Sequence, residues 1–340
     1  IGVPGNSDNR YTSGHARVYE WSGANWTQLG GDIDGEVAGD EFGRSVSLSS
    51  DGKRLAVGAP YNDRNETGAG YVRVYGWSGT SWTQLGDDID GEAKYDNSGK
   101  SVSLSSDGKH LAIGAPGHYW DWRAGYVRVY GWSGTSWAQL GGDIDGKAPK
   151  DEFGRSVSLS SDGKRLAIGA PSAGYVRVYG WDTTSSSWIQ LGGDIDGETG
   201  WDYSGISVSL SSDGMRLAIG APGNDGTLYG AGHVRVYQWS GTSWAQLGGD
   251  IDGEAEYDNS GRSVSLSSDG RRLAIGAPKH YWRAGHVRVY DDSCSIPPMG
   301  IEADDDDRIN TGELVDHDQL IRLYPNPAGE VINLEIAECI

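Results

Sequence analysis

Carboxylates recur at a fixed spacing around a repeated Asp-Ile-Asp-Gly sequence. The first copy has carboxylates at relative positions one, three, five and nine. A loop with oxygen ligands at this spacing could hold Ca²⁺, which takes six to eight of them. Calcium is therefore the one cofactor that the sequence suggests. The candidate ligands in the four copies that keep the spacing are Asp32, Asp34, Glu36, Asp40, Asp88, Asp90, Glu92, Asp96, Asp194, Asp196, Glu198, Asp202, Asp250, Asp252, Glu254 and Asp258.

A second interpretation of these acidic segments stays open. The copy that begins at Asp143 carries Lys147 at position five, where a cation would be repelled. In this interpretation the segments are solvated links whose aspartates cap turns and pair with the arginines of a repeated Val-Arg-Val sequence. Those arginines are Arg17, Arg73, Arg128, Arg177, Arg235 and Arg288.

Aromatic residues beside arginine form a second group with recognition chemistry. They lie in segments 117–123 and 279–283, whereas the equivalent segment of a third repeat is only Ser172 and Ala173. Tyr and Trp offer flat apolar faces with hydrogen-bond donors, which suits sugar rings or a protein partner. The alternative is that these aromatics fold back over the edge of their own sheet. The candidate ligand-binding residues are Tyr119, Trp120, Trp122, Arg123, Tyr281, Trp282 and Arg283.

Motifs of catalysis are missing from the sequence. It has no Gly-x-Ser-x-Gly, no paired His ligands on one element and no Gly-rich phosphate loop. His15, His233 and His286 occupy a repeat position that holds Tyr71 and other tyrosines elsewhere. Because His exchanges with Tyr there, a structural role is favoured, and we expect a protein that is not an enzyme.

A repeat of 51 to 56 residues must position these groups. Within one unit, alternating residues and turn sequences predict four strands, at 45–49, 54–58, 71–77 and 82–85. A Ser-Asp-Gly turn joins the first two, where Gly supplies the positive φ. The Ser-Val-Ser-Leu-Ser-Ser-Asp-Gly sequence that opens each unit begins at Ser45, Ser101, Ser156, Ser207 and Ser263.

Four short antiparallel strands in about 55 residues make one propeller blade, whereas a solenoid coil is about half as long and a sandwich about twice. The fold class is therefore all-β, a β-propeller with four-stranded antiparallel blades. The second and third strands occur six times and the first and fourth five times, so six blades are visible. The opening blade lacks its first strand and the last blade its fourth. A seventh blade stays open if the chain is truncated at its N-terminus. Small serines on the innermost strand let neighbouring blades approach.

Charge and composition exclude several classes. The chain has 28 Lys+Arg against 48 Asp+Glu, a net charge of −20, which opposes binding to nucleic acid. No apolar run approaches the ~20 residues of a membrane span. Two cysteines, Cys294 and Cys339, exclude a disulfide scaffold and leave one bridge open. The start at Ile1 leads us to expect a processed, trimmed or missing N-terminal segment.

A family resemblance rests on paired motifs within each unit. Phe-Gly at 42–43 precedes Gly-Ala-Pro at 58–60, and Phe-Gly at 153–154 precedes Gly-Ala-Pro at 169–171. This pattern resembles the FG-GAP repeat of integrin α-subunit propellers and their bacterial relatives over roughly residues 1–290. The resemblance implies a propeller. The family carries a calcium loop between the two motifs, but here that interval is shortened to the Ser-Ser-Asp-Gly turn.

The last fifty residues differ in composition. Residues 291–318 are expected to be an acidic linker. The sequence Leu-Tyr-Pro-Asn-Pro-Ala at 323–328 and an alternating strand at 331–336 resemble the opening of the type A C-terminal sorting domain of the bacterial type IX secretion system. Segment 319–340 is then a truncated sorting domain, which implies export through the outer membrane and release or attachment at the cell surface. The alternative is a short strand after a Pro-rich turn.

Together these features predict a secreted or cell-surface, non-enzymatic binding or adhesion module that presents variable loops on a rigid propeller. Its expected partner is a protein or glycan at the cell surface. Two alternatives stay open: a structural subunit of an extracellular filament or appendage, which would self-assemble, and a carbohydrate-binding lectin. Near-identical blades favour multivalent contact, because weak sites on one rigid body gain avidity.

Overall fold

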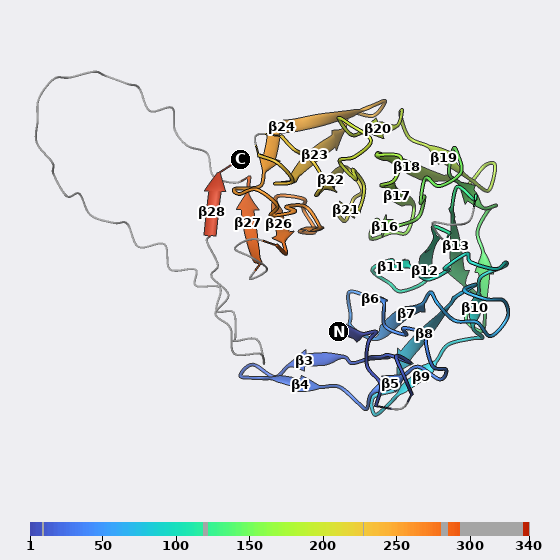
Figure 1. Cartoon of the computed structure of the whole chain (residues 1–340). Helices are drawn as coiled ribbons and strands as arrows, with labels where there is room; N and C mark the ends of the chain where they lie inside the picture. The colour runs from blue at the N-terminus through green and yellow to red at the C-terminus, as the bar shows by residue number, and fades with distance from the viewer. Residues whose placement is uncertain (9, 118–121, 227, 280–284, 293–335, 340) are drawn as a thin grey trace, which may run out of the picture.

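The computed structural model describes residues 1–340 except 9, 118–121, 227, 280–284, 293–335 and 340. Their strands form sheets that follow one another around a common centre, with the inner strands nearest to it (Figure 1). The described residues contain no helix, so none of them could form a helical membrane span. The fold is a β-propeller with six blades visible, as the repeat predicts.

The described strands fall into inner, second, third and fourth positions of a blade; the first blade lacks an inner strand and the last blade lacks an antiparallel fourth strand. The inner strands are β6 (Ser45–Leu48), β11 (Ser101–Leu104), β16 (Ser156–Leu159), β21 (Ser207–Leu210) and β25 (Ser263–Leu266). The second strands are β1 (Gly2–Val3), β7 (Arg54–Ala59), β12 (His110–Ala115), β17 (Arg165–Ala170), β22 (Arg216–Ala221) and β26 (Arg272–Ala277). The third strands are β2 (His15–Ala16) with β3 (Tyr19–Trp21), β8 (Tyr71–Trp77), β13 (Tyr126–Trp132), β18 (Tyr175–Asp182), β23 (His233–Trp239) and β27 (His286–Asp291). The fourth strands are β4 (Trp26–Gln28), β9 (Trp82–Gln84), β14 (Trp137–Gln139), β19 (Ser187–Gln190) and β24 (Trp244–Asp252).

A short strand that the sequence analysis missed lies inside the acidic segment. It occurs as β5 (Ile33–Asp34), β10 (Ile89–Asp90), β15 (Ile144–Asp145) and β20 (Ile195–Asp196), each paired with the third strand of its blade. In β10, Ile89 lies opposite Val72 and is buried, whereas Asp90 is exposed. The alternation of Asp, Ile and Asp is the signal that could have predicted this strand.

The C-terminal strand β28 (Ile336–Cys339) pairs in parallel with β27. It occupies the side of the last blade on which a fourth strand is missing. The predicted linker at 291–318, Cys294 and most of the predicted strand at 331–336 lie outside the described residues, apart from the first two residues of the linker. The division into linker and sorting segment therefore stays a prediction.

Serines of the inner strands bond one blade to the next. The Ser101 hydroxyl donates to the carbonyl of Gly154 at 2.8 Å, and the Ser103 hydroxyl accepts from the backbone N–H of Leu159 at 3.0 Å. Equivalent serines make the same bonds at the neighbouring blade junctions. The serines leave room for the next blade, as the sequence analysis expects. They also form hydrogen bonds with the backbone groups of that blade.

Paired tryptophans close the outer hairpin of a blade and also reach the preceding one. Trp77 lies opposite Trp82, with ring centroids 5.3 Å apart, which confirms the predicted cross-strand packing. In addition, Trp82 Nε1 donates to the carbonyl of Leu29 in the preceding blade at 2.8 Å. The same bond recurs from Trp137, Trp188 and Trp244, so the second tryptophan of these hairpins also joins two blades.

The hydrophobic core lies between blades. Val127 and Val129 of one blade pack with Leu166 and Ile168 of the next. Such clusters recur at successive junctions, so each blade is stabilised by its neighbours.

The first junction differs because the described part of the opening blade has no inner strand, and β1 pairs only with β2. As a result Val46 and Leu48 of β6 are 37% and 45% exposed, against 9% and 7% for Val102 and Leu104 of β11. The missing first strand, predicted from the repeat count, therefore leaves an apolar strand face uncovered.

Gly114→Ala is expected to destabilise the propeller by at least about 2 kcal/mol, because overpacking a close contact forces the backbone to move. A Cβ at Gly114 would lie 2.0 Å from the carbonyl oxygen of Gly154 in the next blade. Gly142→Ala is the matched control, since a Cβ at Gly142 meets no atom within 4 Å. Urea unfolding of both variants measures the effect. Equal unfolding midpoints would show that the blade junction tolerates a methyl group.

Candidate binding face and its acidic loops

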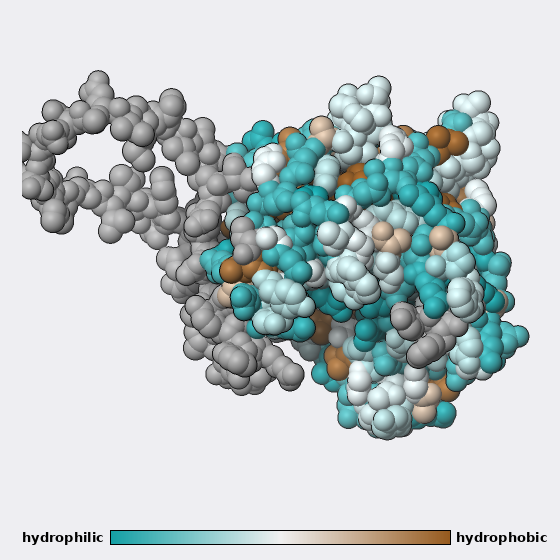
Figure 2. Space-filling view, turned by 45° about the horizontal axis from the view of Figure 1, so that its top comes forward, coloured by the Kyte–Doolittle hydropathy of each residue, from teal (hydrophilic) through white to brown (hydrophobic). Residues whose placement is uncertain are grey.

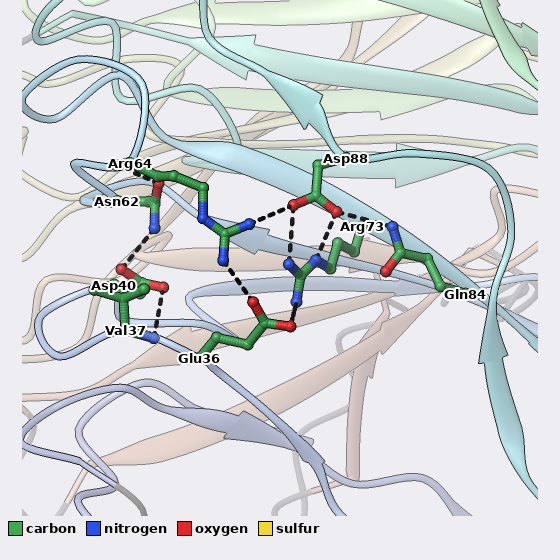
Figure 3. Close-up of polar contacts among 8 residues, drawn as sticks. All are labelled: Glu36, Val37, Asp40, Asn62, Arg64, Arg73, Gln84 and Asp88. Atoms are coloured by element: carbon green, nitrogen blue, oxygen red, sulfur yellow. Dashed lines mark hydrogen bonds and ion pairs between the residues drawn. The ribbon is translucent and has the colours of Figure 1, made fainter.

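The first carboxylate of each acidic segment pairs with the arginine of the third strand in the same blade. Asp88 accepts hydrogen bonds from Arg73 Nε at 2.7 Å and Nη2 at 2.9 Å, and from Gln84 Nε2 at 2.8 Å (Figure 3). Asp32, Asp143, Asp194 and Asp250 pair with their own strand arginines. This position therefore anchors the segment to the blade.

The carboxylate at position five reaches the following blade instead. Glu36 pairs with Arg73 at 3.0 Å and with Arg64 at 2.5 Å, and Arg64 also contacts Asp88 at 3.3 Å (Figure 3). Glu92, Glu198 and Glu254 similarly pair with Arg128, Arg235 and Arg288. The acidic segment thus forms an ion bridge between blades.

The carboxylate at position nine caps its own loop. Asp40 is buried, accepts from Asn62 Nδ2 at 2.8 Å and lies 3.3 Å from the N–H of Val37 (Figure 3). Burial raises the pKa of Asp40. The equivalent Asp151 accepts from two backbone N–H groups of its loop and from the Tyr175 hydroxyl at 2.8 Å. This aspartate fixes the turn that leads into the inner strand.

Lys147, which replaces the glutamate at position five, also bridges to the next blade. Its ammonium pairs with Asp194, the carboxylate that Arg177 contacts at 2.8 Å. An ion pair between blades is therefore kept even though a positive charge replaces the negative charge at position five.

The carboxylates of one segment point to different partners, as the second interpretation of the sequence expects. Calcium binding stays a prediction. The groups that could hold a cation are His15 with Asp32 and Asp34, and His233 with Glu198 and Asp250; the ligand atoms of each lie within 4.8 Å of one another.

In each of these two groups, one carboxylate already accepts hydrogen bonds from an arginine. The hydrogen bond from Arg17 lowers the pKa of Asp32 to about 2, and that from Arg235 lowers the pKa of Asp250 to about 2. Burial, aided by Arg235, lowers the pKa of His233. His233 is thus held in its neutral form beside the carboxylates.

Most of the predicted aromatic anchors lie outside the described residues: Tyr119, Trp120, Tyr281, Trp282 and Arg283. Trp122 is described and is 74% exposed, with the ammonium of Lys150 4.5 Å from its ring centroid. Arg123 instead pairs with the buried Asp96. The structure therefore assigns Arg123 to the loop framework and leaves Trp122 on the surface.

Further exposed aromatics, which the sequence analysis did not select, lie at the same end of the blades. Tyr11 and Tyr229 are in loops between second and third strands and are 79% and 60% exposed. Trp201 and Tyr257 lie just before inner strands and are 79% and 57% exposed. In an antiparallel blade these two kinds of loop meet, and the rings of Tyr229 and Tyr257 are 5.3 Å apart. These aromatics occur in some repeats and not in others, and this irregular occurrence is the sequence signal that could have identified them.

We call these exposed aromatics, with Trp122, the aromatic face. Framework tryptophans recur in every hairpin, but these residues differ from blade to blade. Blade packing therefore does not require them.

Residues 33–75 match the FG-GAP repeat family. The fold is similar to that of hydrazine synthase from Kuenenia stuttgartiensis, with a TM-score of 0.54 and 18% identity over 82% of this chain and 70% of that one. It is also similar to periplasmic gluconolactonase from Pseudomonas aeruginosa, with a TM-score of 0.52 and 19% identity over 80% and 72% of the two chains. No curated protein matches the sequence. At these identities the structural similarity shows the fold alone, a β-propeller.

Arg73→Gln is expected to destabilise the protein by about 2–3 kcal/mol, because it leaves the partly buried Asp88 carboxylate without its closest cation. The Arg73 side chain is 6% exposed and neutralises both Glu36 and Asp88. Arg17→Gln is the control, because its side chain is 36% exposed and its loss should matter less. Denaturant unfolding compares the two variants, and equal losses would contradict a bridge between blades.

His233→Tyr is expected to reduce the loss of stability below neutral pH. Because burial lowers the pKa of His233, the unfolded chain binds a proton more readily, and stability falls as the pH drops below about 6.5. Tyrosine fills this repeat position in other blades. The melting temperature of both proteins at pH 7 and pH 5 measures the effect. An unchanged difference between the two pH values would exclude His233 as its source.

Proposed function

We propose that the protein is a secreted or cell-surface binding module, not an enzyme, and that its aromatic face recognises a glycan or protein at the cell surface. The observation that carries the proposal is the gathering of exposed Trp and Tyr side chains in loops at one end of a rigid scaffold. Such side chains supply contact area at low entropic cost and are frequent among binding hot spots.

The surface of the protein suits a polar partner. The surface in Figure 2 is mostly hydrophilic, with hydrophobic residues exposed in small separate patches. An open hollow of about 720 Å³ near the loop of Tyr11 is lined by Arg10, Asp34, Glu36 and Arg64. Rings beside charged groups suit a partner with apolar faces and many hydroxyl groups.

Export belongs to the same proposal. It rests on the Leu-Tyr-Pro-Asn-Pro-Ala sequence at 323–328, which resembles a bacterial sorting signal and lies outside the described residues. The proposed location is the extracellular side of the outer membrane, where a surface-binding protein meets its partner.

The double variant Trp122→Ala, Trp201→Ala is expected to lose at least about tenfold in binding to intact bacterial cells or arrayed glycans, because hot-spot aromatics dominate binding energy. Its melting temperature should stay unchanged, since both rings are more than 70% exposed.

Trp26→Ala is the matched control for the double variant. Trp26 is 61% exposed but lies in the β3–β4 hairpin of the first blade, away from the aromatic face. Equal binding by wild type and the double variant would overturn the assignment of the face. A large fall in melting temperature would show that the aromatics pack the blade edges.

A further inference from the structure

Basic residues occupy one repeated position at the centre of the propeller. The residue directly before each inner strand is Arg44, Lys100, Arg155 or Arg262, and only the blade of β21 has Ile206 there. In a chain of net charge −20 this concentration of cations runs against the overall charge. We call these four residues the central basic cluster.

The same turn presents each member. The backbone N–H of Arg44 bonds to the carbonyl of Glu41 at 3.0 Å, and the turn of Arg155 has the same bond to Glu152. Glu41 and Glu152 have φ values of 51° and 56°, in the left-handed region that costs energy for residues other than glycine. Each turn leads into an inner strand, and neighbouring inner strands contact one another around the centre (Figure 1). The turns that carry the four cations therefore surround the same centre.

Lys100 shows how closely these charges interact. Its side chain is half-buried, and Nζ bonds to the Tyr61 hydroxyl at 2.6 Å. Burial, followed by repulsion from Arg155 and Arg44, lowers the pKa of Lys100 to about 7. The same two arginines act on Arg262.

Acidic residues compensate the cluster only in part. Glu41 contacts Arg44 at 3.4 Å, and Glu41 and Glu152 both act on Lys100. Four cations therefore face two carboxylates. A bound anion would offset the remaining repulsion and supply acceptors for the guanidinium groups, which bind oxyanions through two parallel hydrogen bonds.

We propose that the central basic cluster binds a small multivalent oxyanion of the phosphate, sulfate or polycarboxylate class. A small anion is favoured over a polymer because the field of a chain of net charge −20 repels extended polyanions. The cluster uses residues other than those of the aromatic face, and its test does not depend on the proposed function.

Isothermal titration calorimetry with inorganic sulfate and with citrate tests the site. Both anions should bind the full chain about tenfold more tightly at pH 6 than at pH 8.5, because Lys100 titrates between these values and binding favours its charged form. The charged groups that act on Lys100 are Arg44, Arg155, Glu41 and Glu152, with Tyr61 as its hydrogen-bond partner. Absence of binding by both anions at pH 6 overturns the proposal.

Variants locate the binding. Lys100→Met and Arg155→Gln should each weaken it about tenfold, and Lys100→Met should also remove the pH dependence. Ile206→Arg adds a cation at the vacant position and should tighten binding. Lys164→Gln is the control, because this exposed lysine directly follows the Ser-Asp-Gly turn at the other end of the inner strand.

Folding is separated from binding by the melting temperature in the absence of anion. Lys100→Met should melt no lower than wild type, because it removes a poorly solvated charge. If Lys100→Met does not fold, Arg155→Gln and Ile206→Arg still decide the outcome. Equal affinity in wild type, Arg155→Gln and Ile206→Arg would place the anion elsewhere.

Discussion

Neighbouring blades can pack together because a backbone carbonyl of one glycine contacts a second glycine, whose lack of a side chain leaves room for it, in the preceding blade. At one junction the oxygen of Gly154 faces Gly114, and the hydroxyl of Ser101 donates to it. A buried carbonyl needs a hydrogen-bond donor, and a β-carbon at Gly114 would occupy its place. One contact therefore requires both a glycine on the second strand and a serine on the inner strand. This explains why the chain combines a high glycine content with serines at alternate positions of every inner strand.

The close approach of blades also determines the charge pattern. From the second blade on it places the third-strand arginine beside the loop of the preceding blade, where Arg73 and Arg128 are buried, and a buried charge must be compensated. Arg73 receives Asp88 from its own blade and Glu36 from the preceding one. Lys147 and Asp194 form an equivalent ion pair between blades, in which the loop residue carries the positive charge. The carboxylates of one segment therefore pair with different partners, while calcium binding stays a prediction. The repeated acidic spacing therefore follows from the pairing of blades.

Sequence reasoning predicted the blade because each strand and turn has a local signal that recurs. The Val-Arg-Val-Tyr strand and the Ser-Asp-Gly turn appear nearly as expected. It missed strands such as β10, because the Asp-Ile-Asp alternation that marks them is only three residues long and their pairing partner is distant in the sequence. It also could not show that Glu36 contacts Arg73, since that contact exists only across a junction. The exposed aromatics were partly missed for a similar reason, since Tyr229 and Tyr257 meet only in space.

The repeat separates the residues that the fold requires from those that it tolerates. Where every blade keeps one residue type, as at Gly114, packing explains it. Where blades differ at one position, the fold accepts each alternative. Ile206 shows that the position before the inner strand accepts an apolar side chain in the same turn, closed by the same backbone bond, that carries Lys100 in another blade. Half-burying an ammonium near two guanidinium groups costs free energy that an isoleucine does not. The fold therefore does not require a cation at this position, which supports the proposed role of Lys100 in binding an anion.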